Sequence, residues 1–75
     1  MINFSKAFSL MKKGIKVRQK FWSEDYYIYI EGNHIYDSLG NLYISDADEF
    51  HKKNKDVYDH HFTYDIYDDD IDSHL

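Results

Sequence analysis

The beginning of the chain has hydrophobic side chains at the spacing of a helix. We expect a helix over residues 4–13, with an apolar face formed by Phe4, Ala7, Phe8 and Met11. Asn3 is a suitable N-cap, and Gly14 is the residue type that most readily ends a helix in a left-handed conformation. The pattern therefore predicts an amphipathic N-terminal helix that buries one face.

Beyond residue 14 the apolar residues alternate, which is typical of strands. The pattern predicts strands at residues 15–18, 26–31, 34–37, 42–44 and 62–67. Gly32–Asn33 and Gly40–Asn41 are turn residues that tolerate a positive φ, so the three strands they connect should form an antiparallel meander. Residues 26–31 have apolar or aromatic side chains on both faces, which favours a central strand or one covered by a partner subunit.

Acidic residues followed by lysines predict a short second helix over residues 46–53, with Ala47 and Phe50 facing inward. Ser45 and Asp48 resemble a capping box at its start, whereas residues 54–61 give only a weak signal. The expected fold class is α+β: an N-terminal helix packed on a small antiparallel β-sheet, with the second helix before the last strand. Residues 1–67 should form one domain, and residues 68–75 an acidic tail that we expect to be flexible.

The chain has 75 residues and no cysteine, which excludes disulfides and thiolate ligands. A domain of this size buries only roughly three-fifths of the surface that its unfolded chain exposes. Small domains without disulfides or metals often gain stability by association, so we expect a homo-oligomer, either a dimer or a tetramer. The apolar runs are too short for a membrane span or a signal peptide, which makes the cytoplasm the expected compartment.

Charge is distributed unevenly along the chain. The formal net charge is −5, yet residues 1–20 hold six of the nine lysines and arginines and none of the fourteen acids. This asymmetry suggests two surfaces with different electrostatic preferences.

Arg18, Lys20 and Trp22 alternate in sequence, and their side chains combine cationic donors with a flat ring. Nucleotide binding needs both, because the base stacks on an aromatic ring and the phosphates take cationic donors. The alternative is that Trp22 anchors the core and the basic side chains are solvated. Tyr27 and Tyr29 share one face of the next strand, where they would either enclose a ligand or seal a subunit interface.

The C-terminal acidic residues allow a second hypothesis. They are Asp65, Asp68, Asp69, Asp70 and Asp72. With the neighbouring tyrosines they could imitate the phosphates of a nucleic acid and bind a basic protein, although such a tail is more often a solvated end.

Nothing in the sequence has the form of a catalytic or metal-binding motif. His60 and His61 are adjacent, so on a strand they would point to opposite sides, and neither has the spacing of a zinc site. No nucleophile elbow or glycine-rich phosphate loop accompanies the serine, histidine and aspartate residues. We therefore expect a protein that is not an enzyme, with no catalytic residues, no metal and no cofactor.

The first thirty residues resemble a known family. The helix that ends in Lys12, Lys13 and Gly14, the run 15–18, the aromatic pair with Trp22 and the strand 27–30 are similar to the Thoeris anti-defence 2-like domain. In that alignment Arg18 corresponds to the basic position of the family and Trp22 to its tryptophan. Members commonly end in an Asp-Trp pair on the last strand, and residues 63–67 lack this second tryptophan.

The resemblance implies a small phage protein that is oligomeric and binds an immune signal of the host cell without degrading it. The signals are glycocyclic ADP-ribose or cyclic oligonucleotides, bound between subunits, with no direct contact to nucleic acid or membrane. One branch of the family is described as an inhibitor of a CRISPR nuclease, so the alternative partner is a host defence protein. On this resemblance Arg18 and Lys20 would contact phosphates, Trp22 would stack on a base, and Tyr27 or Tyr29 would help to enclose the ligand.

Overall fold

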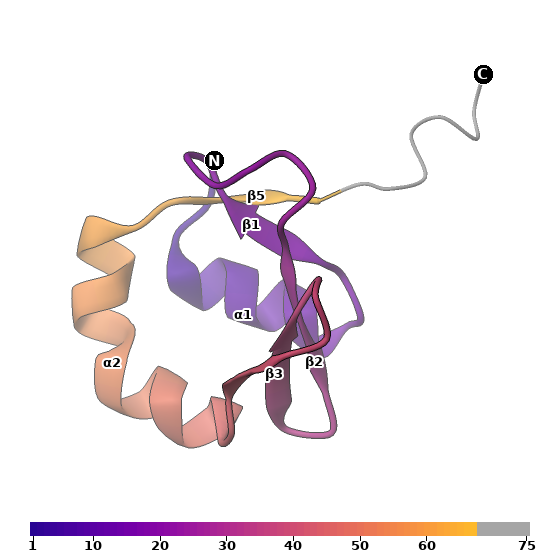
Figure 1. The fold of residues 1–75 in the computed structure, drawn as a ribbon. Coiled ribbons are helices and arrows are strands. Elements are labelled where there is room, and N and C mark those ends of the chain that lie inside the picture. The colour runs from indigo at the N-terminus through magenta and orange to yellow at the C-terminus, as the bar shows by residue number, and fades with distance from the viewer. Residues whose placement is uncertain (68–75) are drawn as a thin grey trace.

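The computed structural model describes residues 1–67 and has the expected α+β fold (Figure 1). The first helix, α1 (Phe4–Lys12), begins at Asn3, whose side-chain oxygen accepts a hydrogen bond of 2.9 Å from the amide of Lys6. The helix ends at Lys12, one residue earlier than predicted, and Gly14 follows its C-cap with a φ of 90°. Both ends of the helix were predicted from capping residues.

Five strands form a single antiparallel sheet. Their bounds are Val17–Gln19 (β1), Ile28–Glu31 (β2), His34–Asp37 (β3), Leu42–Ile44 (β4) and Tyr64–Ile66 (β5). The order across the sheet is β4-β3-β2-β1-β5, so β2 is the central strand, as its apolar residues on both faces predicted. Strands β2, β3 and β4 form the predicted meander.

The turns of the meander use positive φ at three positions. Gly32 and Asn33 have φ values of 55° and 45°, and Gly40 has 87°. The prediction of a positive φ at Asn41 is wrong, because Asn33 is the only non-glycine residue within residues 1–67 with that geometry. Asn41 is instead held by Asp37: its amide donates to Asp37 Oδ1 (2.9 Å) and its carbonyl accepts from the Asp37 amide (3.0 Å).

Three strands are shorter than the alternating pattern predicted, and one of them, expected at 26–31, begins only at Ile28. The first, expected at 15–18, begins at Val17 because the amide of Ile15 donates to the carbonyl of Leu10 (3.1 Å) and still belongs to the end of α1. The last, expected at 62–67, is limited to Tyr64–Ile66, which is the segment that lies opposite β1. Strand ends therefore follow hydrogen-bond partners, which alternation does not identify.

The second helix, α2 (Ala47–His61), begins one residue later than predicted and ends eight residues later than the predicted 46–53. Ser45 is not its cap: the Oδ1 atom of Asp46 accepts a hydrogen bond of 3.0 Å from the amide of Glu49. The inward positions Ala47 and Phe50 were predicted correctly, since Ala47 is buried and Phe50 packs against the core.

Residues 54–61 gave a weak signal because the inward side of α2 is partly polar there. The side chain of Asn54 donates to the carbonyl of Phe50 (3.0 Å), and Tyr58 packs against the ring of Phe4, with 5.0 Å between ring centroids. These contacts depend on α1, so they leave little trace in the local apolar spacing.

Helix α1 packs on one face of the sheet, and α2 packs on α1 (Figure 1). The buried core between them consists of Phe4, Ala7, Phe8, Met11, Val17, Ile28, Ile35, Ala47 and Tyr64. Within residues 1–67 neither helix covers the opposite face of the sheet, which we call the open face.

Candidate functional site

The ligand residues predicted from the sequence lie on two different surfaces. Trp22, in the loop between β1 and β2, packs on the helix side of the sheet, where its ring meets the buried ring of Tyr64 edge-on. Tyr27 and Tyr29 alternate with Ile28, which is buried beneath α1, so both tyrosines project from the open face. The structure therefore does not bring Trp22 together with the two tyrosines.

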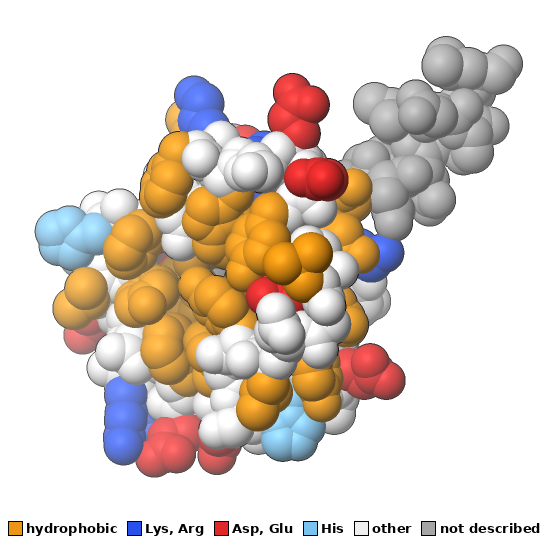
Figure 2. All heavy atoms as spheres, viewed as in Figure 1, with side chains coloured by type: hydrophobic (Ala, Val, Ile, Leu, Met, Phe, Trp, Pro, Cys, Tyr) orange, Lys and Arg blue, Asp and Glu red, His pale blue; other side chains and the backbone are white. Residues whose placement is uncertain are grey.

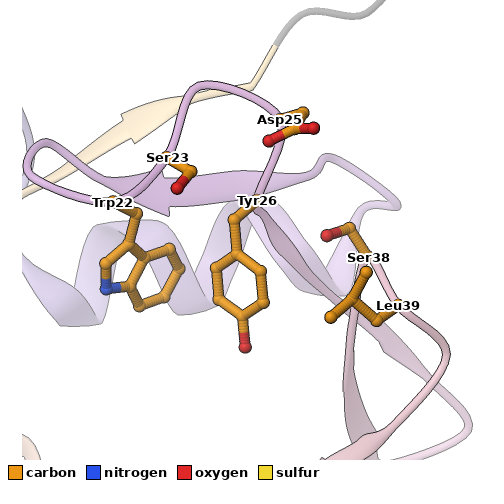
Figure 3. A pocket seen from close by; sticks show the side chains of 6 residues that line it. All are labelled: Trp22, Ser23, Asp25, Tyr26, Ser38 and Leu39. Carbon is orange, nitrogen blue, oxygen red and sulfur yellow. The ribbon is translucent and has the colours of Figure 1, made fainter.

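Trp22 forms one wall of a pocket of about 390 Å³ (Figure 3). The pocket is lined by Trp22, Ser23, Asp25, Tyr26, Ser38 and Leu39. The rings of Trp22 and Tyr26 stand nearly perpendicular, with 5.0 Å between their centroids and an angle of 77° between their planes. We call this the Trp22 pocket, and its volume is within the usual range of small-molecule sites.

A buried carboxylate, that of Asp37, accepts hydrogen bonds from two residues that line the Trp22 pocket. Asp37 is 6% exposed and accepts hydrogen bonds from the hydroxyl of Tyr26 (3.0 Å) and the amides of Leu39 (3.0 Å) and Asn41 (2.9 Å). Burial alone would raise the pKa of Asp37, but these hydrogen bonds outweigh it and keep the pKa below its ordinary value. Burial and the bond to Asp37 raise the pKa of Tyr26.

Tyr26 was predicted to begin a strand but was not assigned to a site. The signal that was available is the spacing of Tyr26 and Asp37, which lie near the two ends of the hairpin formed by β2 and β3. Antiparallel pairing returns the chain to its starting point, so the two side chains meet. No sequence pattern within the loop 20–25 predicted that Trp22 would pack beside Tyr26.

Four tyrosines cover the open face, and we call them the tyrosine face. They are Tyr27, Tyr29, Tyr36 and Tyr67, all half-buried. Ring centroids lie 4.4 Å apart for Tyr27 and Tyr67, 6.1 Å for Tyr27 and Tyr29, and 5.9 Å for Tyr29 and Tyr36. The rings thus form a continuous aromatic band from the segment after β5, across β2, to β3.

The open face also carries the basic side chains of β1 and its flanks. The Nζ atom of Lys16 lies 4.9 Å from the centroid of the Tyr27 ring, and Lys20 is exposed just after β1. Asp65 lies opposite Arg18 in the register, and its carboxylate is 3.7 Å from the N-terminal ammonium group. The tyrosine face therefore has cationic groups beside it.

Arg18 supports the loop that carries Trp22. Its Nη2 atom donates to the carbonyl oxygens of Trp22 and Ser23, the latter at 3.2 Å, and its Nε atom is buried without a hydrogen-bond partner among residues 1–67. These two bonds hold the guanidinium against the backbone of the loop, and the predicted phosphate contact of Arg18 stays a prediction. In this structure the side chain of Arg18 positions Trp22.

A serine, a histidine and an aspartate meet between the two helices. Ser5 Oγ lies 2.7 Å from Asp59 Oδ2 and 3.0 Å from His51 Nε2, and the Ser5 amide donates to Asp59 Oδ1 (2.7 Å). The serine proton goes to the carboxylate, so the histidine ring must donate to the serine and does not act as its base. This arrangement joins the helices and does not have the order of a catalytic triad.

Most of the C-terminal aspartates that could imitate nucleic-acid phosphates lie outside the residues that the structure describes. Asp68, Asp69, Asp70 and Asp72 fall beyond residue 67. Within residues 1–67, no group of three or more histidine or acidic side chains has the arrangement of a metal site.

No family model, curated protein or solved structure matches this chain. Among residues 1–67 neither helix is both long and apolar enough to cross a bilayer.

Proposed function

We propose that this protein binds a nucleotide-type ligand on its tyrosine face and sequesters it without chemical change. The observation that carries the proposal is the band of four tyrosine rings on the open face, with Lys16 beside it. Each ring offers a stacking surface for a base or a second aromatic group.

Charge favours the tyrosine face over the Trp22 pocket for a ligand with phosphates. Lys16 lies against Tyr27 on the open face, and we assign it to phosphate binding together with Lys20, which is exposed in the turn after β1. The Trp22 pocket is lined by Asp25 and by no lysine or arginine among the described residues. A phosphate would be repelled there. In this proposal Trp22 therefore does not contact the nucleotide ligand.

A second copy of the chain is part of the proposal. Small-molecule sites usually bury most of the ligand surface, and an open sheet face cannot do so alone. Half-buried tyrosines are also enriched at subunit interfaces. Two tyrosine faces turned toward each other would enclose a flat ligand, which unites the ligand and interface hypotheses for Tyr27 and Tyr29.

The ligand class follows from the resemblance of the first thirty residues to the Thoeris anti-defence 2-like domain. We propose glycocyclic ADP-ribose or a cyclic oligonucleotide as the ligand, bound in the cytoplasm of an infected cell. Sequestration acts by mass action: the sites must outnumber the signal, and their Kd must lie below its concentration. This function needs no catalytic residue.

The test is native mass spectrometry of the protein alone and with a panel of cyclic ADP-ribose isomers and cyclic di- and trinucleotides. We expect an oligomer that gains the mass of intact ligand and releases it unchanged on denaturation. Tyr29→Leu should weaken binding by the value of one stacked base, about 1–3 kcal/mol, or roughly 5- to 150-fold in Kd. Trp22→Leu is the matched control and should bind as the original protein does.

Two results would contradict the proposal. Loss of binding in Trp22→Leu, with Tyr29→Leu unaffected, would move the site to the Trp22 pocket. A monomer that takes up none of the panel would remove the function altogether and leave the inhibitor of a host defence nuclease as the remaining hypothesis. That inhibitor would act through Asp65 and the acidic residues that follow it.

A further inference from the structure

The Trp22 pocket has no role in the proposed nucleotide function, yet it is built like a binding site. Figure 3 shows the indole of Trp22 and the ring of Tyr26 side by side, with Ser38 and Leu39 beyond them and Asp25 at the rim. In the view of Figure 2, hydrophobic side chains gather across the middle of this side of the molecule, and charged groups lie mainly around its edge. The Trp22 pocket thus has two aromatic rings and one acidic group in its lining.

The electrostatic character of the pocket is negative. Asp25 is exposed and is the one charged side chain in its lining. Behind the ring of Tyr26, the hydroxyl donates to the carboxylate of Asp37 at 3.0 Å. Donation to a carboxylate makes the phenol ring more electron-rich, and the rings of both Tyr26 and Trp22 line the cavity.

The nearest cation of the loop is directed elsewhere. The Arg18 guanidinium donates to the carbonyl oxygens of Trp22 and Ser23, so it lies against the backbone of the loop. It fixes the position of the indole and is not part of the pocket lining.

We propose that the Trp22 pocket binds a small organic cation, specifically an alkylated ammonium group. Two nearly perpendicular aromatic rings next to a carboxylate attract such a group through cation–π interactions, and its low hydration favours an apolar cavity. The volume of about 390 Å³ accommodates a choline-sized head group. The carboxylate at the rim excludes anions, which keeps this site separate from the tyrosine face.

Intrinsic fluorescence tests the proposal directly, because Trp22 is the single tryptophan of the chain. The purified protein is titrated with choline and, separately, with 3,3-dimethylbutan-1-ol, a neutral molecule of nearly the same shape. We expect a saturable change of the Trp22 emission with choline and a Kd at least about tenfold weaker for the alcohol, since a desolvated cation–π contact contributes up to about 2 kcal/mol.

Variants of two neighbouring acids provide a matched pair. Asp25→Asn should weaken choline binding by about fivefold, the upper end for an exposed charge pair. Glu24→Gln removes the same charge next to the pocket lining and should leave the Kd unchanged. Both side chains are exposed, so neither substitution threatens folding.

Three outcomes would overturn the inference. Equal affinity for choline and the alcohol would make the site a simple apolar pocket. No change of the Trp22 emission with choline would show that the Trp22 pocket does not bind the cation. Saturation of the Trp22 signal by adenosine monophosphate, with choline unable to compete, would assign the pocket to nucleotides.

Discussion

Asp59 joins the two helices through both oxygens of its carboxylate. One oxygen accepts from the Ser5 amide and the other from the Ser5 hydroxyl, each at 2.7 Å. Burial alone would raise the pKa of Asp59, but the bonds from Ser5, with the charge of the nearby His51, lower it below its ordinary value. The folded protein therefore favours the ionised form of this residue.

Asp59→Asn should destabilise the protein at neutral pH by about 1.5–3 kcal/mol, the range for hydrogen bonds to a charged group. The contribution should depend on pH. A lowered pKa gives stability that is fully present above the pKa of an unfolded aspartate and is lost as the pH falls through the folded value.

Urea denaturation at pH 7 and at steps down to pH 3 measures this difference. The gap between Asp59→Asn and the original protein should narrow in acid. Asp56→Asn, an exposed residue of the same helix, is the control and should have little effect. A gap that stays constant with pH would show that the carboxylate charge is not what stabilises the contact.

Which single residues could be assigned from the sequence depended on the range of their contacts. Asn3 and Gly14 were predicted as helix ends because capping is local. Trp22 and Tyr29 were placed in one site because they are close in the chain and share a chemistry. The alternation of β2 puts Tyr29 on the open face. The loop places Trp22 on the helix side of the sheet, and no pattern in the loop sequence predicts that path.

At the scale of elements, α2 shows how a helix begins where a polar side chain caps it. Asp46 Oδ1 accepts from the amide of Glu49 and from the side chain of Asn33, so the cap also joins α2 to the turn between β2 and β3. The bond from the Glu49 amide and the bond from the Asn33 side chain both lower the pKa of Asp46. Ser45, one residue earlier, was the sequence-based choice for the cap.

Asp46→Ala should therefore lower the thermal midpoint of unfolding, and Ser45→Ala should leave it nearly unchanged. The reason is that the alanine at position 46 leaves the amide of Glu49 without its partner at the start of α2. Thermal unfolding followed by circular dichroism at 222 nm compares the two variants. The reverse order of midpoints would restore Ser45 as the cap.

The expected elements were all found, but their lengths were not all predicted. The meander depends on glycine turns and alternation, which are local, so β3 and β4 have the predicted bounds and β2 begins two residues late. Residues 54–61 are helical through contacts with α1, such as that between Tyr58 and Phe4. A single-sequence pattern does not contain such a partner.

For the molecule as a whole, the core is organised around one ring. Phe4 is 1% exposed and contacts the rings of Phe8, Phe50, His51, Tyr58 and Tyr64, which come from both helices and the sheet. A domain of this length has a total stability of about 4–11 kcal/mol. Loss of this single ring therefore removes a large part of what holds the fold together.

Phe4→Ala should cost about 3–5 kcal/mol and leave the protein partly unfolded at 37 °C. Phe21→Ala is the matched control, because Phe21 is 75% exposed, and it should change the free energy of unfolding little. Guanidinium denaturation of both variants gives the comparison. A cost of below about 1 kcal/mol for Phe4→Ala would mean that the remaining rings fill the space.

The position of β5 has a consequence for how the protein is made. β1 and the backbone of Ile2 both pair with the segment Tyr64–Ile66, which lies more than forty residues further along the chain. While the ribosome is still synthesising α2, the nascent chain lacks β5, so one edge of β1 is unpaired and Phe4 lacks its contact with the ring of Tyr64. Folding of this protein is therefore completed after, and not during, the synthesis of most of its length.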